Sequence, residues 1–172
     1  MSHLGSAARG LVAICAGFFL ATGWTQPELR PLPLLLRSVS DEVGALSDAQ
    51  AKDLSKALQD IFESTSVRTM VVIAGTVKPE PIPDYAERLA RRWTLERALD
   101  PTQSIFVIVA VDDREMQVLP GSALRLDMEL TDPSIARDLA PLFRERRYFE
   151  ALMKLMERLR GILESNMPAR SI

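Results

Sequence analysis

The chain has 172 residues, of which 47% are hydrophobic and 26% are charged, and its formal net charge at pH 7 is −2. This length and hydrophobic content are sufficient for one domain with a substantial buried core. The slight negative charge gives no indication of a nucleic-acid partner, which would need a basic surface.

The first 23 residues have the features of a secretory signal peptide. Arg9 precedes the unbroken small or apolar run Leu11–Ala21, and Ala21–Gly23 supplies small residues at the spacing that signal peptidase requires. We expect cleavage after Gly23, a mature chain that begins near Trp24, and a periplasmic or secreted protein. The alternative is retention by an uncleaved short N-terminal anchor. No later stretch is long and apolar enough to span a bilayer.

Removing residues 1–23 also removes His3 and Cys15, the only histidine and the only cysteine. A mature chain without either residue type excludes a disulfide framework, a structural zinc site with the usual ligands, and nucleophilic catalysis by Cys-His or Ser-His-Asp. Any remaining chemistry has to use carboxylates, hydroxyls, Arg, Lys, or a metal held by oxygen ligands.

Residues 24–37 form a leader in which Pro27, Pro31 and Pro33 disfavour a helix, so we expect an extended conformation. The pattern leaves two alternatives open for Leu34–Leu36, which either dock on the domain or form an edge strand. Ordered structure is expected to begin near Val39. The domain then covers residues 38–165, and residues 166–172 form a flexible tail.

The first half of the domain predicts helix, strand, helix. Ser47 and Gln50 form a capping box at the start of the first helix. Its apolar residues share one helix face: Leu54, Ala57, Leu58, Ile61 and Phe62. Thr69–Ala74 is a short buried strand, and a second helix starts at Pro83. The apolar side of that helix consists of Ala86, Leu89, Ala90 and Trp93.

The run Ile105–Val111 contains seven consecutive apolar residues and predicts a strand buried on both faces. Polar and apolar residues then alternate from Glu115 to Val118, as in a strand with one wet face. Asp112–Arg114 between them is therefore a tight hairpin turn. A strand buried on both faces needs helices above and below it, which predicts an α/β fold, a three-layer α/β/α sandwich with a mixed, mostly parallel sheet.

The C-terminal part predicts a short edge strand over Leu124–Leu130, followed by two helices. Asp132 caps the first of these, and Pro141 bends or interrupts it. The last helix carries its apolar residues at alternating four- and three-residue steps: Tyr148, Leu152, Leu155, Leu159 and Ile162.

Four stretches in this order resemble the TPM domain, a family of thylakoid-lumen and related exported proteins, some of them described as acid phosphatases. The stretches are Val39–Ser47, Asp84–Trp93, Val109–Arg114 with Val118–Gly121, and Leu130–Asp132 leading to Pro141–Arg144 and Tyr148–Glu150. The resemblance implies an α/β/α sandwich located outside the cytoplasm.

The sequence departs from the family pattern mainly in the loops. Thr102–Ser104 stands where the family places an acidic or amide residue followed by glycine before the central strand, and Ala123 and Arg125 replace a glycine and an acid after the hairpin. A cation such as Ca²⁺ requires six to eight oxygen ligands, several of them carboxylates, and arginine at an acidic position repels it. The metal site that the resemblance implies is therefore interpreted as eroded.

Candidate residues for a pocket or a partner surface are Asp41, Asp100, Asp112, Asp113 and Arg114. Each also has a structural interpretation, because aspartates in turns bond the nearby backbone. Asp41 fits a turn or cap, and Asp100 fits the end of the second helix before Pro101. If a metal cage were intact, its carboxylates would come from Asp112, Asp113 and Asp127.

Two classes of function remain open. The chain is either a non-catalytic module that binds a protein partner in the envelope, or a phosphatase that uses Ca²⁺ or Mg²⁺ to act on phosphomonoesters. The missing loop glycines and acids favour the first class, with no cofactor and no metal expected. The fold alone does not decide between them.

Overall fold

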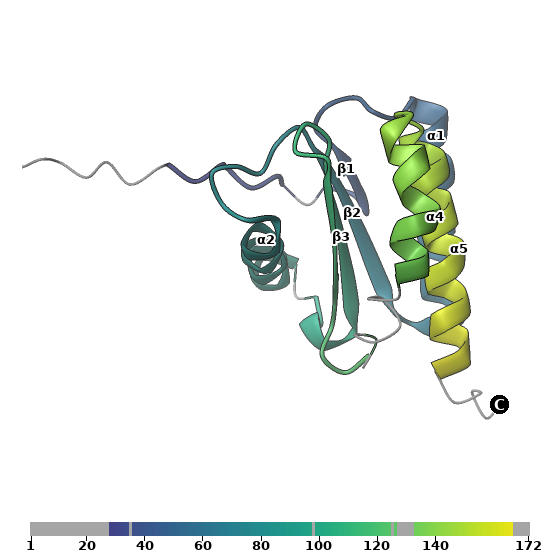
Figure 1. The fold of residues 1–172 in the computed structure, drawn as a ribbon. Helices are drawn as coiled ribbons and strands as arrows, with labels where there is room; N and C mark the ends of the chain where they lie inside the picture. The colour runs from purple at the N-terminus through teal and green to yellow at the C-terminus, as the bar shows by residue number, and fades with distance from the viewer. Residues whose placement is uncertain (1–27, 35, 98, 125, 127–132, 167–172) are drawn as a thin grey trace, which may run out of the picture.

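The computed structural model describes residues 28–34, 36–97, 99–124, 126 and 133–166 (Figure 1). The elements occur in the order β1 (Val39–Asp41), α1 (Asp48–Thr65), β2 (Arg68–Ala74), α2 (Ile82–Arg97), the 3-10 helix η1 (Pro101–Gln103), β3 (Ser104–Ala110), β4 (Glu115–Pro120), α4 (Pro133–Arg144) and α5 (Tyr148–Asn166). None of the helices in these ranges is long and apolar enough to cross a bilayer.

The sheet has the strand order β1-β2-β3-β4. β1, β2 and β3 are parallel, whereas β4 returns antiparallel to β3 with Ala110 opposite Glu115. The predicted mixed, mostly parallel sheet with a hairpin after the central strand is confirmed. All seven residues of β3 are buried, as the continuous apolar run indicated.

Helices cover both faces of the sheet, so the predicted three-layer sandwich is also confirmed (Figure 1). α1, α4 and α5 pack on one face against the side chains of Val71, Ile73, Val107 and Val109. α2 packs on the other face, where it contacts the alternate strand residues. Its predicted apolar side is buried throughout: Ala86, Leu89, Ala90 and Trp93.

The predicted start of α1 is confirmed in detail. The Gln50 N–H donates to the Ser47 hydroxyl over 3.3 Å, and the Ser47 N–H donates to the Gln50 side-chain oxygen over 2.9 Å. These reciprocal bonds satisfy backbone donors that a helix start otherwise leaves without partners. The helix ends at Thr65, and the next residue, Ser66, has φ 60°, the left-handed conformation that stops many helices.

The leader packs against α2 through residues that precede the predicted leucines. The Trp93 indole N–H donates to the Pro33 carbonyl over 2.9 Å, and Leu32 packs on the core beside α2. The side chains of Leu34 and Leu36 are 61% and 74% exposed, so those two neither dock nor pair as an edge strand. The edge strand begins instead at Val39.

Two predictions about helix ends were tested. Of the two alternatives for Pro141, a bend or an interruption, the interruption is wrong, because α4 continues to Arg144. A proline removes one backbone donor, and so close to the helix end this loss affects a single bond. Asp100 does not end α2, which stops at Arg97; it caps η1 instead by accepting a hydrogen bond from the Thr102 N–H. Asp132 and most of the predicted strand at 124–130 lie outside the described residues.

Candidate functional site

The carboxyl ends of β1, β2 and β3 meet at one end of the sheet, which is where an α/β fold usually builds its site. Asp41 ends β1, Gly75 follows β2, and the turn Asp112–Arg114 follows β3. The Asp112 N–H donates to the Gly75 carbonyl over 2.7 Å, so the two loops continue side by side beyond their strands. Four of the five predicted site residues therefore come from loops at this end.

The Asp41 carboxylate is committed to the loop that follows β1. One oxygen accepts a hydrogen bond from the Val43 N–H over 3.1 Å, and the other accepts one from the Leu46 N–H over 2.8 Å. Gly44 between them has φ +64°, a left-handed conformation that glycine adopts without strain. Both carboxylate oxygens therefore hold the chain's own backbone in this turn.

The Asp113 carboxylate joins the hairpin turn to the loop between β2 and α2. It accepts hydrogen bonds from the Thr76 hydroxyl over 2.8 and 2.9 Å and from the Val77 N–H over 2.8 Å, and the Lys78 ammonium lies 3.4 Å away. Its side chain is 5% exposed. Burial raises the pKa of Asp113, but the donors from Val77, Thr76 and Lys78 outweigh burial and lower the pKa below its usual value.

We expect Asp113→Asn to lower the free energy of unfolding by about 1–3 kcal/mol at neutral pH, because the carboxamide presents donors to groups that themselves donate. A lowered carboxyl pKa contributes stability above the unfolded-state pKa of about 3.9, and this contribution is lost as the pH falls through the folded-state pKa. Urea unfolding measures this at about pH 7 and about pH 3. The difference in unfolding free energy between the wild type and the variant should be smaller at the lower pH.

The control for this measurement is Asp60→Asn, which changes an exposed carboxylate on α1. It should leave the unfolding free energy within about 0.5 kcal/mol of wild type at neutral pH. A gap between wild type and Asp113→Asn that stays constant down to about pH 3 would contradict the role assigned to the ionised Asp113 carboxylate.

Asp112 and Arg114 differ from Asp41 and Asp113, whose carboxylates accept hydrogen bonds from the protein. Asp112 is exposed and has no side-chain hydrogen bond or ion pair with any described residue. Its Oδ2 lies 3.0 Å from the position that a Cβ on Gly75 would occupy, so a larger residue at position 75 would require the Asp112 side chain to move. Arg114 has φ 57° and closes the turn by donating its N–H to the Val111 carbonyl over 3.4 Å. The turn therefore presents one uncommitted carboxylate.

A cluster of charged groups surrounds a buried tyrosine where the leader and the β1 loop approach α2. Tyr85 is fully buried, and its hydroxyl has no hydrogen-bond partner among the described residues. Burial, together with the negative charge of Glu42, raises the pKa of Tyr85 to about 12. The Arg88 guanidinium, 5.5 Å from the Tyr85 ring, pairs with Glu80 and donates to the Arg30 carbonyl over 3.0 Å. Burial also raises the pKa of Glu42, against the opposing charge of Arg30.

Sequence reasoning assigned no role to this cluster. Tyr85 lies four residues before Leu89, so the apolar stripe of α2 could have placed it in the core. Nothing in the sequence pattern connects Glu42 to Tyr85, because their proximity depends on how β1 sits beside the start of α2.

The described carboxylates at this end do not fit Ca²⁺ or Mg²⁺. Ca²⁺ takes six to eight oxygen ligands, and Mg²⁺ requires a near-octahedral set. Within the described ranges, no group of three or more His, Cys, Asp or Glu residues is placed to hold a metal ion. Of the three candidate aspartates described at this end, Asp41 and Asp113 bond the protein's own donors, and Asp112 does not. Asp127, the third predicted ligand, lies outside the described residues.

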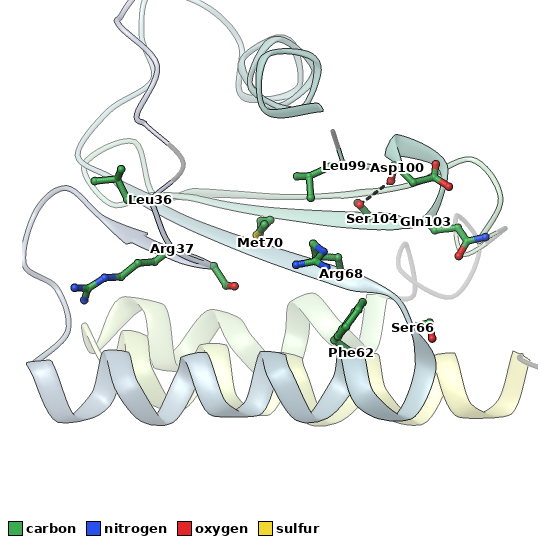
Figure 2. Close-up of a pocket in the computed structure, with 11 residues that line it drawn as sticks. Leu36, Arg37, Phe62, Ser66, Arg68, Met70, Leu99, Asp100, Gln103 and Ser104 are labelled. Carbon is green, nitrogen blue, oxygen red and sulfur yellow. Dashed lines mark hydrogen bonds between the residues drawn. The ribbon is translucent and has the colours of Figure 1, made fainter. Parts of the chain in front are cut away.

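Asp100 lies at the opposite end of the sheet, before β3 rather than after it. There it lines a groove of about 500 Å³ (Figure 2). Its carboxylate accepts hydrogen bonds from the Thr102 hydroxyl over 2.7 Å and from the Thr102 N–H over 2.8 Å, and these bonds lower the pKa of Asp100. The structure therefore separates Asp100 from the other four candidates.

This groove lies where β1, β2 and β3 begin and α1 ends. The sequence alone did not predict it. Its lining residues are Leu36, Arg37, Ser38, Phe62, Ser66, Arg68, Met70, Leu99, Asp100, Gln103 and Ser104. Figure 2 shows Arg68 across its middle, between Met70 on the sheet and Phe62 on α1. The exposed arginines near the apolar strand Thr69–Ala74 were the available signal, but their position beside Leu99 depends on the tertiary fold.

The sheet, the helices on both its faces and the hairpin after the central strand together define an α/β/α sandwich. Residues 39–162 match the TPM domain. The chain therefore belongs to the TPM domain family.

Solved structures of three bacterial proteins share this fold. The N-terminal domain of the cg2496 protein from Corynebacterium glutamicum is 14% identical, with a TM-score of 0.62 over 84% of this chain and 92% of that one. The N-terminal domain of a P. gingivalis protein is 26% identical, with a TM-score of 0.60 over 78% and 88%. The BA42 protein from Bizionia argentinensis is 15% identical, with a TM-score of 0.61 over 73% and 86%. No curated protein matches the chain.

Proposed function

We propose that this chain is an exported TPM-domain protein that binds a protein partner and does not carry out metal-assisted phosphate hydrolysis. The apolar run and small residues in positions 1–23 support a periplasmic or secreted location, with retention by a short N-terminal anchor as the alternative. The two locations differ in the N-terminus of the isolated protein, which mass spectrometry reads directly.

The commitment of the loop carboxylates carries this proposal. Asp41 bonds two backbone amides, and Asp113 bonds a hydroxyl, an amide and an ammonium group. A metal at this end would have to displace these donors, and each displaced donor would lose a hydrogen bond or ion pair that holds these loops. Asp112, the one of these three aspartates that bonds no donor among the described residues, provides at most two oxygens, whereas a hard cation needs six or more.

The competing function is a phosphatase that depends on a divalent cation. A metal ion present at about 100 times its Kd would add about 2.7 kcal/mol to the free energy of unfolding. This would raise the melting temperature by several degrees. We expect no such shift when the full chain is heated with millimolar Ca²⁺, Mg²⁺ or Mn²⁺. We also expect no metal-dependent hydrolysis of a phosphomonoester by the same samples.

Asp112→Asn and Asp53→Asn provide the matched comparison, because both carboxylates are exposed and Asp53 lies on α1, away from these loops. A metal-induced rise of several degrees that disappears in Asp112→Asn and persists in Asp53→Asn would favour the phosphatase and overturn the proposal.

A further inference from the structure

The turn that joins α4 to α5 carries three arginines, of which one is bonded to the acidic residues of the same turn. The Arg147 guanidinium donates to the Glu145 carboxylate over 2.9 Å and to the Glu150 carboxylate through two of its nitrogens. The hydrogen bonds from Arg147 lower the pKa of Glu150. Arg147 therefore engages both carboxylates of the turn.

Arg144 and Arg146 lie on either side of Glu145 and differ from Arg147. Both residues are exposed, and neither forms an ion pair or a side-chain hydrogen bond with any described residue. Because Glu145 and Glu150 already bond Arg147, these two guanidinium groups keep all their donors for a ligand. A guanidinium group matches the geometry of a carboxylate and can bond it through two parallel N–H groups.

The backbone of the turn does not account for an arginine at position 146. Arg146 has φ 58°, its N–H donates to the Phe143 carbonyl over 3.1 Å, and the Arg147 N–H donates to the Leu142 carbonyl over 2.9 Å. This pattern closes a helix with a left-handed residue, which is usually glycine, because a side chain at this φ is strained. Residues held in such conformations cluster at functional sites.

Three aromatic side chains border the two arginines. The rings of Phe143 and Tyr148 lie 6.2 Å apart, and Phe149 follows them in the chain. All three are half-buried and pack on the core, so part of each ring stays accessible. Arginine beside phenylalanine and tyrosine is the composition that protein interfaces favour.

A protein partner fits this turn better than a lipid surface does. Binding to a bilayer depends on apolar side chains that insert into it. The large apolar side chains that the described part of the chain exposes all lie elsewhere: Leu29, Leu34, Leu36, Val43 and Leu95. Figure 1 shows the α4–α5 turn at the end of the sandwich from which the hairpin Asp112–Arg114 also projects. This is the end at which α/β folds usually bind their ligands.

We propose that the α4–α5 turn binds an acidic segment of a partner protein. The carboxylates of the segment pair with Arg144 and Arg146, and its apolar side chains contact the three aromatic rings. Positive charge on this chain and negative charge on the partner set the selectivity. The inference rests on the proposed partner-binding function and specifies the chemistry of the partner and the place where it binds.

A synthetic peptide of about eight residues, in which glutamates flank a pair of leucines, tests the assignment against ¹⁵N-labelled full chain by NMR. At about 1 mM peptide, we expect shifts at the amides of Arg146, Arg147 and Tyr148. A peptide with lysine in place of glutamate should bind at least about tenfold more weakly. Added salt should weaken binding of the acidic peptide.

Arg146→Gly and Arg114→Gly are the matched variants, because each removes one exposed, unpaired guanidinium group from a backbone with nearly the same φ, 58° and 57°. Both should keep or raise the urea midpoint, since glycine adopts this φ without strain. Arg114 lies in the hairpin between the exposed carboxylates of Asp112 and Glu115, which offset its charge. Arg146→Gly should weaken acidic peptide binding at least about fivefold, whereas Arg114→Gly should leave it within about twofold.

Arg144→Gln removes the second charge without touching the left-handed residue, and it should weaken acidic peptide binding at least about threefold. No shift at the turn amides at about 1 mM peptide, equal binding of the lysine peptide, equal loss in the two glycine variants, or unchanged binding in Arg144→Gln would overturn the proposal. Shifts at the turn amides that depend on protein concentration without peptide would assign the turn to a second copy and also overturn it.

The same labelled sample separates this inference from the proposed function on which it rests. Titration with Ca²⁺ that moves the amides of Gly75 and Asp112 would overturn the absence of metal chemistry and leave the assignment of the α4–α5 turn unaffected. Turn amides that ignore the acidic peptide, in a sample that also ignores Ca²⁺, would overturn the assignment of the turn alone.

Discussion

Ile108→Asp is expected to abolish folding. Ile108 is 0% exposed at the centre of β3, between Val72 of β2 and Gln117 of β4, and its side chain belongs to the core beneath α2. A carboxylate at this position finds no partner, and an unpaired buried charge costs several kcal/mol in addition to the lost apolar burial. A domain of this size has a total stability of about 5–15 kcal/mol, so the variant should lack a cooperative melt followed by circular dichroism.

Two further variants make this result interpretable. Ile108→Val removes one methylene group and should cost about 0.5–1.5 kcal/mol with the fold retained. Lys56→Ala changes an exposed residue of α1 and should alter the free energy of unfolding by less than about 0.5 kcal/mol. Melts of Ile108→Asp and Lys56→Ala that coincide would contradict the central position of β3.

The fold could be predicted from sequence because its main elements carry strong local patterns. The capping box at Ser47 and the apolar stripe of α1 specify a helix without reference to the rest of the chain. The unbroken run of β3 specifies a strand buried on both faces, and that requirement gives the sandwich. The prediction failed at Asp100, because a capping aspartate looks the same in sequence whether it ends one helix or begins the next.

The roles of the loop carboxylates could not be predicted in the same way. Asp113 and its partners Thr76 and Val77 are 37 and 36 positions apart in the chain, and they meet only because β2 and β3 are neighbours in the sheet. An aspartate pair in a turn therefore looks like one feature in sequence. In the structure, however, the Asp113 carboxylate is hydrogen-bonded to a neighbouring loop, whereas Asp112 is exposed. The groove depends on an even finer detail, the register at which β1 begins to pair with β2.

Gly121→Ala is expected to destabilise the protein by about 3 kcal/mol or more. A Cβ at position 121 would lie 2.3 Å from the Thr102 carbonyl oxygen and 2.5 Å from the Pro101 carbonyl oxygen, far inside van der Waals contact. Both obstacles are backbone atoms, so no side-chain rotation relieves the overlap. Hydrogen bonds also fix the two segments, since the Gly121 N–H donates to the Ser104 carbonyl over 2.8 Å and the Ala123 N–H to the Thr102 carbonyl over 3.1 Å.

Gly161→Ala is the matched control, because it adds the same methyl group to the same residue type. Gly161 lies inside α5, and a Cβ there meets nothing within 4 Å. The substitution should stabilise the protein by about 0.5–1 kcal/mol, since glycine is a poor helix former. Urea unfolding should therefore move the two midpoints in opposite directions. Equal midpoints for both variants would show that the approach of Gly121 to η1 is looser than the distances indicate, and that the wall of the groove beside Asp100 can shift.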